Sequence, residues 1–348
     1  MDTFMIPRNP EARFEITNRC HYDCAICVKN KLTRPRGMMD LATFRRLLDK
    51  ILDECDWIKT VSFAGMGAPL SNPDIVDIVR HVDTLGLEPI LVTNGDLLTP
   101  DLFARLQDAG LRSVRVSFHG ITPEGYSRLH GVESSKFYKV KSQLDDIFTI
   151  KDRTKILMTL VIMKGINEGP VEDWIAMWEG KADLIEAWTA HNWVNQLNNR
   201  AVQGERVRTC GRIEHGPLQI QVDGTINACC FDWDGKLTYG DLNKQTLSEI
   251  FSSESYARIL HAHQTGDHTG LICEHCDQRN ASKADALIYS SKYPDKVERV
   301  KMTSTCYEKA GSGTTLKVAK ELGRNFVGYE ISKSYEKIIN LKLEPKVF

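Results

Sequence analysis

Hydrophobic residues between positions 13 and 188 follow two spacings in turn. Short runs of continuous or alternating apolar residues predict strands, and segments with apolar residues three and four positions apart predict helices. The strands are expected at 13–17, 60–64, 88–93, 113–118, 156–163 and 184–188. The helices are expected near 41–54, 73–85, 100–109, 137–148 and 171–178. This alternation predicts an α/β fold, with a parallel sheet and right-handed crossovers.

The expected helix at 41–54 carries the helical pattern most clearly. Asp40 precedes it as the expected N-cap. Its apolar residues fall on one face, namely Phe44, Leu47, Leu48, Ile51 and Leu52. We therefore expect this face to cover the sheet.

The composition is that of an ordinary soluble globular protein. The chain has 348 residues, about two domains in length, with 42% hydrophobic and 26% charged residues. Its net charge of -1 gives no bulk electrostatic reason to bind nucleic acid or an anionic membrane. The N-terminus lacks the apolar core of a signal peptide, and the longest apolar stretch, 156–163, is too short to cross a bilayer. We expect a cytoplasmic protein.

Three cysteines follow the first expected strand. Cys20, Cys24 and Cys27 have the spacing C-x-x-x-C-x-x-C. A 4Fe-4S cluster has four iron corners, each normally bound by a cysteine thiolate, so three local ligands leave one iron open. The alternative is three unrelated thiols in one loop. The tight clustering of the cysteines favours metal binding in a reducing compartment over a disulfide framework.

This spacing, with Ile26 in the apolar position before the last cysteine, resembles the CX3CXφC signature of the radical S-adenosylmethionine (radical SAM) superfamily. The resemblance implies a partial (β/α)6 barrel with its active site at the C-terminal ends of the strands. It implies that SAM binds the open iron and that one electron cleaves SAM to a 5'-deoxyadenosyl radical. An electron donor such as flavodoxin or ferredoxin is then the expected partner.

The second expected strand is followed by Gly65-Met66-Gly67-Ala68-Pro69, where the family carries its GGEP motif. The resemblance implies that backbone groups here contact the SAM amino group, and small residues let the backbone come close to a ligand. Met66 replaces a common glycine and Ala68 replaces the usual glutamate. Any carboxylate contribution is therefore lost or supplied elsewhere. A plain strand-to-helix turn is the alternative interpretation.

Two further strand ends carry polar residues. By resemblance, Ser117 lies near the SAM ribose, while His119 faces the cavity or its rim and has no assigned catalytic role. Residues 191–193, His-Asn-Trp, form a polar and aromatic group where a substrate could lie.

A second cysteine group lies beyond the expected barrel. Around it, 218–222 and 225–228 predict a hairpin with Asp-Gly at its turn. Residues 210–280 resemble a SPASM or twitch domain of radical SAM enzymes. Because Ser282 stands where a further cysteine would be expected, the resemblance favours the shorter twitch form. It implies one auxiliary 4Fe-4S cluster held by Cys210, Cys229, Cys273 and Cys276.

Several alternatives stay open in this region. Four cysteines would also suit structural zinc, although zinc ribbons usually have two C-x-x-C pairs and only one is present here. Cys230 could be the ligand in place of Cys229, although the spacing from Gly224 favours Cys229. We expect Cys55 to be structural and assign no role to the four nearby histidines, His261, His263, His268 and His275.

The C-terminal segment 310–341 resembles one piece of an amino-DNA methyltransferase, with a glycine-rich loop at 311–313 and an acidic residue, Glu330, after the next expected strand. The catalytic Asp-Pro-Pro-Tyr type motif is absent from the chain, so we expect a remnant without methyltransferase activity. The expected domains are a radical SAM barrel at 1–200, an auxiliary-cluster domain at 201–285 and a tail at 286–348.

The sequence thus predicts a radical SAM oxidoreductase that abstracts hydrogen from its substrate, with the auxiliary cluster taking up an electron. The alternatives are a noncatalytic iron-sulfur electron carrier or redox sensor, and an enzyme of ribosomal peptide maturation. The substrate could be a small molecule, a nucleotide or a peptide. Only about a dozen residues precede the first expected strand, which favours a small molecule or nucleotide over a peptide.

Overall fold

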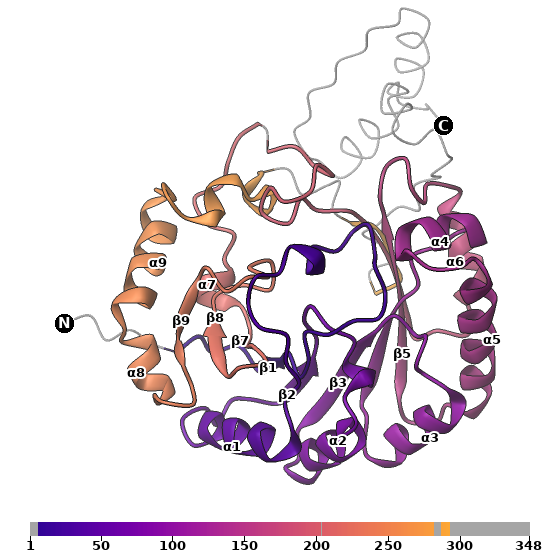
Figure 1. Ribbon diagram of the computed structural model, residues 1–348, viewed down its shortest axis with the longest axis horizontal. Coiled ribbons are helices and arrows are strands. Elements are labelled where there is room, and N and C mark those ends of the chain that lie inside the picture. Colours follow the sequence, from indigo (N-terminus) through magenta and orange to yellow (C-terminus); the bar gives the residue numbers. More distant parts are fainter. Residues whose placement is uncertain (1–5, 203, 282–286, 293–348) are drawn as a thin grey trace, which may run out of the picture.

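The computed structural model describes residues 6–202, 204–281 and 287–292. Its strands form one open sheet in the order β10-β6-β5-β4-β3-β2-β1-β7-β8-β9. The first six strands pair in parallel and curve into an incomplete barrel (Figure 1). They are β1 (Glu11–Phe14), β2 (Thr60–Phe63), β3 (Glu88–Thr93), β4 (Ser113–Ser117), β5 (Lys155–Ile162) and β6 (Leu184–Thr189). The predicted α/β partial barrel is confirmed.

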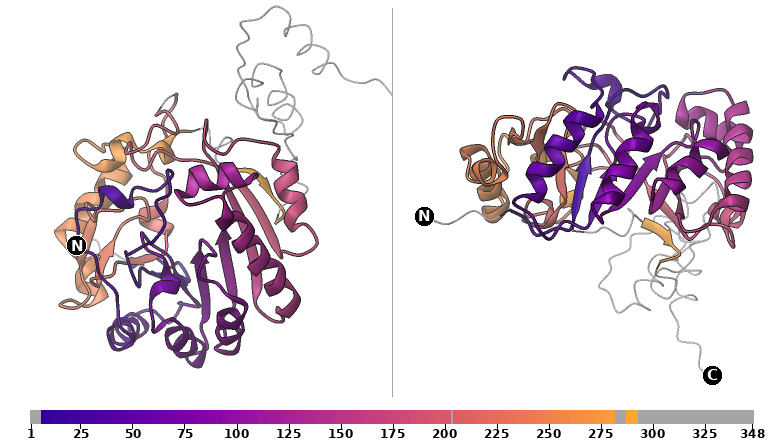
Figure 2. Two further views of the ribbon diagram at one scale, coloured as in Figure 1. Left: turned by 45° about the vertical axis from the view of Figure 1, so that its right-hand side comes forward. Right: turned by 90° about the horizontal axis from the view of Figure 1, so that it is seen from below.

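Helices follow the barrel strands and cover the outer side of the sheet (Figure 2). They are α1 (Leu41–Leu52), α2 (Ile75–Thr84), α3 (Pro100–Asp108), α5 (Ser135–Ile150) and α6 (Val171–Trp178). Asp40 caps α1 as predicted, because its Oδ1 accepts the N–H of Thr43 at 2.7 Å. Helix α4 (Pro123–His130) was not predicted. It is a short helix that begins after the N-cap Thr122 and ends at Gly131.

The largest difference between the predicted and observed strands is at β1. The sequence predicted 13–17, whereas the strand spans Glu11–Phe14. Residues 15–17 leave its regular pairing with β2: the N–H of Glu15 donates to Ile220 O at 2.8 Å, and Ile16 O accepts the N–H of Met39 at 2.9 Å. The loop that follows β1 is therefore fixed at its start by contacts on both sides.

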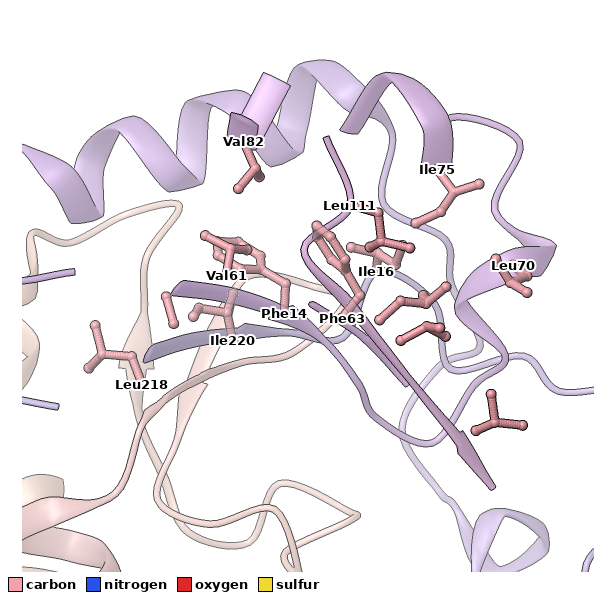
Figure 3. Close-up of a cluster of buried hydrophobic side chains, with 14 of the residues drawn as sticks. Phe14, Ile16, Val61, Phe63, Leu70, Ile75, Val82, Leu111, Leu218 and Ile220 are labelled. Atoms are coloured by element: carbon pink, nitrogen blue, oxygen red, sulfur yellow. The ribbon is translucent and has the colours of Figure 1, made fainter. Parts of the chain in front are cut away.

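The core lies between the sheet and its outer helices. Phe14, Val61 and Phe63 are fully buried on adjacent strands, and Val82 of α2 packs over them (Figure 3). Ile220 belongs to the same core. Because alternate residues of a strand point to opposite faces, the residues between these apolar positions face the inside of the barrel.

The second cysteine region continues the same sheet. Strand β7 (Leu218–Ile220) pairs in parallel with β1, and β8 (Thr225–Asn227) and β9 (Thr238–Asp241) extend the sheet in antiparallel pairing. The predicted hairpin is thus confirmed. Three helices accompany it, α7 (Arg212–His215), α8 (Leu247–Phe251) and α9 (Glu254–Thr265). Glu54, just after α1, accepts the N–H groups of Leu247 and Ser248 at the start of α8.

Residues of the expected tail, 286–348, form the opposite edge of the sheet. Strand β10 (Leu287–Ser290) pairs antiparallel with β6, so these residues belong to the barrel sheet. Ser291 adds two hydrogen bonds to Ile185, at 2.7 and 2.9 Å. The methyltransferase-like segment 310–341 lies outside the described residues. Within the described ranges, no helix has the length and apolar character needed to cross a bilayer.

Two truncated proteins test the contribution of β10. One ends at Asn280 and the other at Lys292, so they differ by residues 281–292. Each lost backbone hydrogen bond is worth roughly 1 kcal/mol, and we therefore expect the shorter protein to lose about 2 kcal/mol or more of unfolding free energy. The measurement is anaerobic urea unfolding, and equal midpoints for the two proteins would contradict the expectation.

Candidate functional site

The three cysteines of the first motif lie in the loop after β1, at the C-terminal ends of the barrel strands. The end of α4 packs against this loop. The N–H of Ala25 donates to Leu129 O at 2.7 Å, and the N–H of Asp23 donates to His130 O at 3.3 Å. Gly131 follows in a left-handed conformation, φ 64°, and a Cβ there would clash with the carbonyl oxygen of Asp23. A glycine is therefore required where α4 meets the cysteine loop.

A second segment holds the same loop from the end of β6. The indole Nε1–H of Trp193 donates to Ile26 O at 2.7 Å. Trp193, Val194 and Asn195 are all left-handed, with φ of 48°, 49° and 68°. Such conformations cost about 1–3 kcal/mol each in a non-glycine residue and persist only where surrounding contacts impose them. This strained turn is therefore held by its contacts and places an aromatic ring beside the cysteine loop.

The first cysteine group has the chemistry that an iron-sulfur cluster needs. Burial raises the pKa of the Cys24 thiol, and the nearby Cys27 and Cys20 raise it further. Burial also raises the pKa of Cys27. Cysteine binds metals as the thiolate. Buried thiols so close to one another therefore need a cationic partner to ionise together. Iron supplies that charge, so the residues fit the cluster.

The loop after β2 is seated directly on the cysteine loop. The N–H of Ala68 donates to Arg19 O at 2.8 Å, and Pro69 begins a short 3-10 helix, Pro69–Ser71. A Cβ on Gly67 would clash with the carbonyl oxygen of Thr17. Gly67 is thus required because its backbone packs closely against the cysteine loop. A plain strand-to-helix turn would not require this contact.

Glu15 lies beside this loop and was not among the expected site residues. Its carboxylate is buried, accepts the N–H of Met66 at 2.9 Å and pairs with Arg34, with Nη1 2.6 Å from Oε1. Gly65 is required here because a Cβ would overlap the Glu15 side chain. The sequence feature that could have identified Glu15 is its position as a charged residue within the expected strand 13–17. Glu15 also supplies a carboxylate next to the loop in which Ala68 replaces the family's glutamate.

A cavity of about 180 Å³ opens inside the barrel next to this loop. Gly65 and Met66 line one part of it, and Cys229 and Cys230 line another. Polar side chains make up much of the remaining wall, from Arg13, Glu15, Arg34, Gln219, Gln221, Asn227 and Asp232. Three aromatic residues complete it, Trp193, Phe231 and Trp233. One space therefore touches both the glycine loop and the second cysteine group.

The second cysteine group surrounds a separate, small cavity. All four expected ligands line it, Cys210, Cys229, Cys273 and Cys276, whereas Cys230 does not. Cys229 Sγ also accepts the N–H of Phe231 at 3.4 Å. Among the described residues, no three His, Cys, Asp or Glu side chains converge closely enough to bind one metal ion. Cysteines spread around a cavity fit a multi-iron cube better than a single zinc ion.

Arg212 places a positive charge beside these cysteines. Burial alone would lower its pKa, but the neighbouring Cys230, Cys229 and Cys210 raise it overall. Its guanidinium also lies over the Phe231 ring, 4.7 Å from the centroid. Because a four-thiolate iron-sulfur cluster carries net negative charge, a buried arginine here would offset part of the cost of burying it.

Residues 191–193 divide between two regions. Trp193 lines the larger cavity, as expected for the substrate group. Asn192 instead bonds to the second cysteine region, with Nδ2 donating to His275 O at 3.1 Å and Oδ1 accepting the N–H of Asp277 at 3.3 Å. Burial and the nearby Arg212 lower the pKa of His191 to about 3, so its ring is neutral.

Two polar residues singled out in the sequence, Ser117 and His119, lie at the end of β4. Ser117 is the last residue of β4, half-buried and paired with Thr159 of β5. The ring of His119 is buried, and its Nδ1 lies 3.1 Å from both Thr159 O and Val161 N. Burial lowers the pKa of His119 to about 4. These contacts fix a neutral ring between β4 and β5, and the role of Ser117 at the SAM ribose stays a prediction.

The Gly67→Ala variant tests the seating of the glycine loop. Its Cβ would displace the loop from Thr17, and we expect SAM affinity to fall roughly tenfold or more, or ~1.4 kcal/mol, while iron content is unchanged. Anaerobic calorimetric titration with SAM measures this. The matched control is Gly37→Ala, whose Cβ would meet Val222 at an ordinary 3.4 Å. Unchanged SAM affinity in Gly67→Ala would contradict the expectation.

Serine variants of the adjacent cysteines test which one is the ligand. We expect Cys229→Ser to lose about half of the bound iron, because each cube holds four irons, and Cys230→Ser to keep all of it. Iron and sulfide analysis after anaerobic reconstitution decides between them. The reverse outcome would make Cys230 the ligand.

Family models match three parts of the chain. The radical SAM superfamily matches residues 14–177, the SPASM iron-sulfur cluster-binding domain matches 210–277, and a DNA methylase model matches 310–341. Among solved structures, BtrN in complex with AdoMet and 2-DOIA has a TM-score of 0.54 at 18% identity, covering 80% of this chain and 98% of BtrN. Streptococcus suis SuiB bound to its precursor peptide SuiA has a TM-score of 0.56 at 13% identity, covering 78% and 70%. At these identities the likeness shows the fold alone.

Curated relatives reach 30% identity and more. One is the tungsten-containing aldehyde ferredoxin oxidoreductase cofactor-modifying protein of Pyrococcus furiosus, 30% identical over 319 residues that cover 77% of this chain and 87% of the relative. Another is a probable GTP 3',8-cyclase of Methanothermobacter thermautotrophicus, 30% identical over 175 residues, 50% of this chain. The chain spans about half the length of such cyclases, 55% in this case. The chain belongs to the radical SAM superfamily and carries a SPASM domain, so its cofactors are SAM, a 4Fe-4S cluster and an auxiliary iron-sulfur cluster.

Proposed function

We propose that this protein is a radical SAM oxidoreductase that abstracts hydrogen from a substrate bound in the cavity of the barrel beside the glycine loop. When bound, its cofactors supply a 5'-deoxyadenosyl radical at one side of this cavity and an electron acceptor at the other, which makes the net reaction an oxidation. The protein's own part is to bind and orient the reactants and to exclude water.

Each group of residues has a separate task in this proposal. Cys20, Cys24 and Cys27 bind the first cluster, and four cysteines bind the auxiliary cluster, Cys210, Cys229, Cys273 and Cys276. The backbone of residues 65–69 holds SAM, with Glu15 fixing the loop through the N–H of Met66. Trp193 and Phe231 pack edge to face, and both rings form part of the cavity wall.

The observation that carries the proposal is the shared lining of the cavity. Gly65 and Met66 line the same space as Cys229 and Cys230. A substrate there would lie between the SAM loop and the auxiliary cysteines, within reach of both. An electron carrier or redox sensor, the alternative from another class, has no need of a cavity beside a glycine loop.

The cavity wall favours a polar substrate. Two arginines, two glutamines and an asparagine offer hydrogen-bond donors and acceptors, namely Arg13, Arg34, Gln219, Gln221 and Asn227. The named relatives include GTP cyclases and a cofactor-modifying protein, which supports a small molecule or nucleotide. A peptide is the second candidate, because the chain is 36% identical to a PqqA peptide cyclase of Rhodopseudomonas palustris over 121 residues, 34% of this chain.

The test is anaerobic purification and reconstitution, iron and sulfide analysis, and assay of 5'-deoxyadenosine after addition of SAM and dithionite. We expect about eight irons, two cubes of four, together with 5'-deoxyadenosine. The Cys24→Ala variant is the control and should form no 5'-deoxyadenosine while keeping the auxiliary iron. Iron without SAM cleavage in the unsubstituted protein would favour the electron carrier.

A further inference from the structure

A buried histidine lies against the first cysteine group and has no task in the proposed function. His130 is the last residue of α4 and is 1% exposed. Its Nδ1 lies 3.3 Å from Cys24 Sγ, and its Nε2 accepts the N–H of His119 at 3.1 Å. The two histidine rings are nearly parallel, 7° apart in plane with centroids 5.3 Å apart. Tyr126 packs against the ring of His130 with a centroid distance of 4.3 Å.

These contacts fix the tautomer of His130. A backbone N–H can only donate, so Nε2 must present its lone pair to His119. The neutral ring then carries its proton on Nδ1, which faces Cys24 Sγ. The ring is therefore a neutral, fixed N–H donor whose acceptor is the sulfur of Cys24.

We propose that His130 is a positioning residue whose Nδ1–H donates a hydrogen bond to the Cys24 thiolate and raises the reduction potential of the cluster bound there. The inference rests on the proposed binding of that cluster by Cys24. Reduction adds one electron, taken from an external one-electron donor, and makes the cluster more negative. A hydrogen bond to a ligand sulfur stabilises the more negative state more strongly. The proton stays on Nδ1 throughout.

The backbone of His130 supports the same contact. Its carbonyl oxygen accepts the N–H of Asp23, the residue before Cys24. Gly131 lets the chain turn immediately afterwards in a conformation without room for a Cβ. Main chain and side chain of one residue therefore hold two adjacent positions of the cysteine loop, which fixes the distance between Nδ1 and the sulfur.

Two substitutions separate the hydrogen bond from the packing. His130→Leu removes the donor, whereas His130→Asn keeps an amide N–H near the position of Nδ1. The full-length reconstituted proteins are titrated with dithionite and followed by electron paramagnetic resonance. The signal that changes on later addition of SAM identifies the first cluster. We expect His130→Leu to lower the ratio of reduced to oxidised first cluster roughly tenfold at a fixed potential, about 59 mV for one electron.

Three comparisons distinguish loss of the hydrogen bond from a general effect of the substitution. His130→Asn should recover most of the shift. The auxiliary signal should be unchanged in both variants. His263→Leu is the matched control, since His263 is equally buried but lines the auxiliary cavity, and it should leave the potential of the first cluster unchanged.

The proposal is overturned if His130→Leu keeps its iron with an unchanged potential, or if His130→Leu and His130→Asn shift it equally. Should His130→Leu fail to bind the first cluster, the unsubstituted protein gives the answer. Labelling with 15N-histidine should alter the electron-nuclear double resonance spectrum of its reduced first cluster, and an unaltered spectrum overturns the proposal. Absence of that cluster from the unsubstituted protein would overturn the proposed function as well, and iron analysis distinguishes the two failures.

Discussion

The arrangement of the site depends on the pairing of β1 with strands on both of its sides. Strand β1 pairs in parallel with β2 on one side and with β7 on the other. Parallel strands end at the same edge of a sheet, so the cysteine loop after β1 and the glycine loop after β2 must lie next to each other. The β7–β8 hairpin brings Cys229 to the same region. One central strand thus connects the cysteine loop, the glycine loop and the hairpin that carries Cys229.

A small apolar cluster lies between the two cysteine groups. Val28, Met66, Val194, Trp233 and Cys276 form a small buried cluster of their own, against which Cys27 packs. Charges near such a region are costly unless they are paired. The charged groups nearby follow this rule, because Glu15 is paired with Arg34 and Arg212 lies among cysteines that raise its pKa. The site therefore combines an apolar cluster with charges that are compensated by neighbouring groups.

Local sequence patterns predicted the elements that depend on local physics. The apolar face and the Asp40 cap of α1, the six barrel strands and the hairpin at Asp223-Gly224 are present as expected, because periodicity, capping and turn preference act over a few residues. The failures have tertiary causes. Helix α4 is short and is held by contacts with the cysteine loop, residues 15–17 leave β1 through bonds to Ile220 and Met39, and β10 finds its partner in β6, about a hundred positions earlier.

The sequence by itself determined which residues could bind metal, since the spacing of Cys20, Cys24 and Cys27 and the C-x-x-C at Cys273 are local features of the chain. Only the tertiary structure decided what surrounds them. Glu15 at the glycine loop, the Trp193 contact to Ile26 and the His130 contact to Cys24 join residues between 51 and 167 positions apart. The physical reason is that a hydrogen bond depends on distance and direction in space, and no periodicity along the chain records either of them.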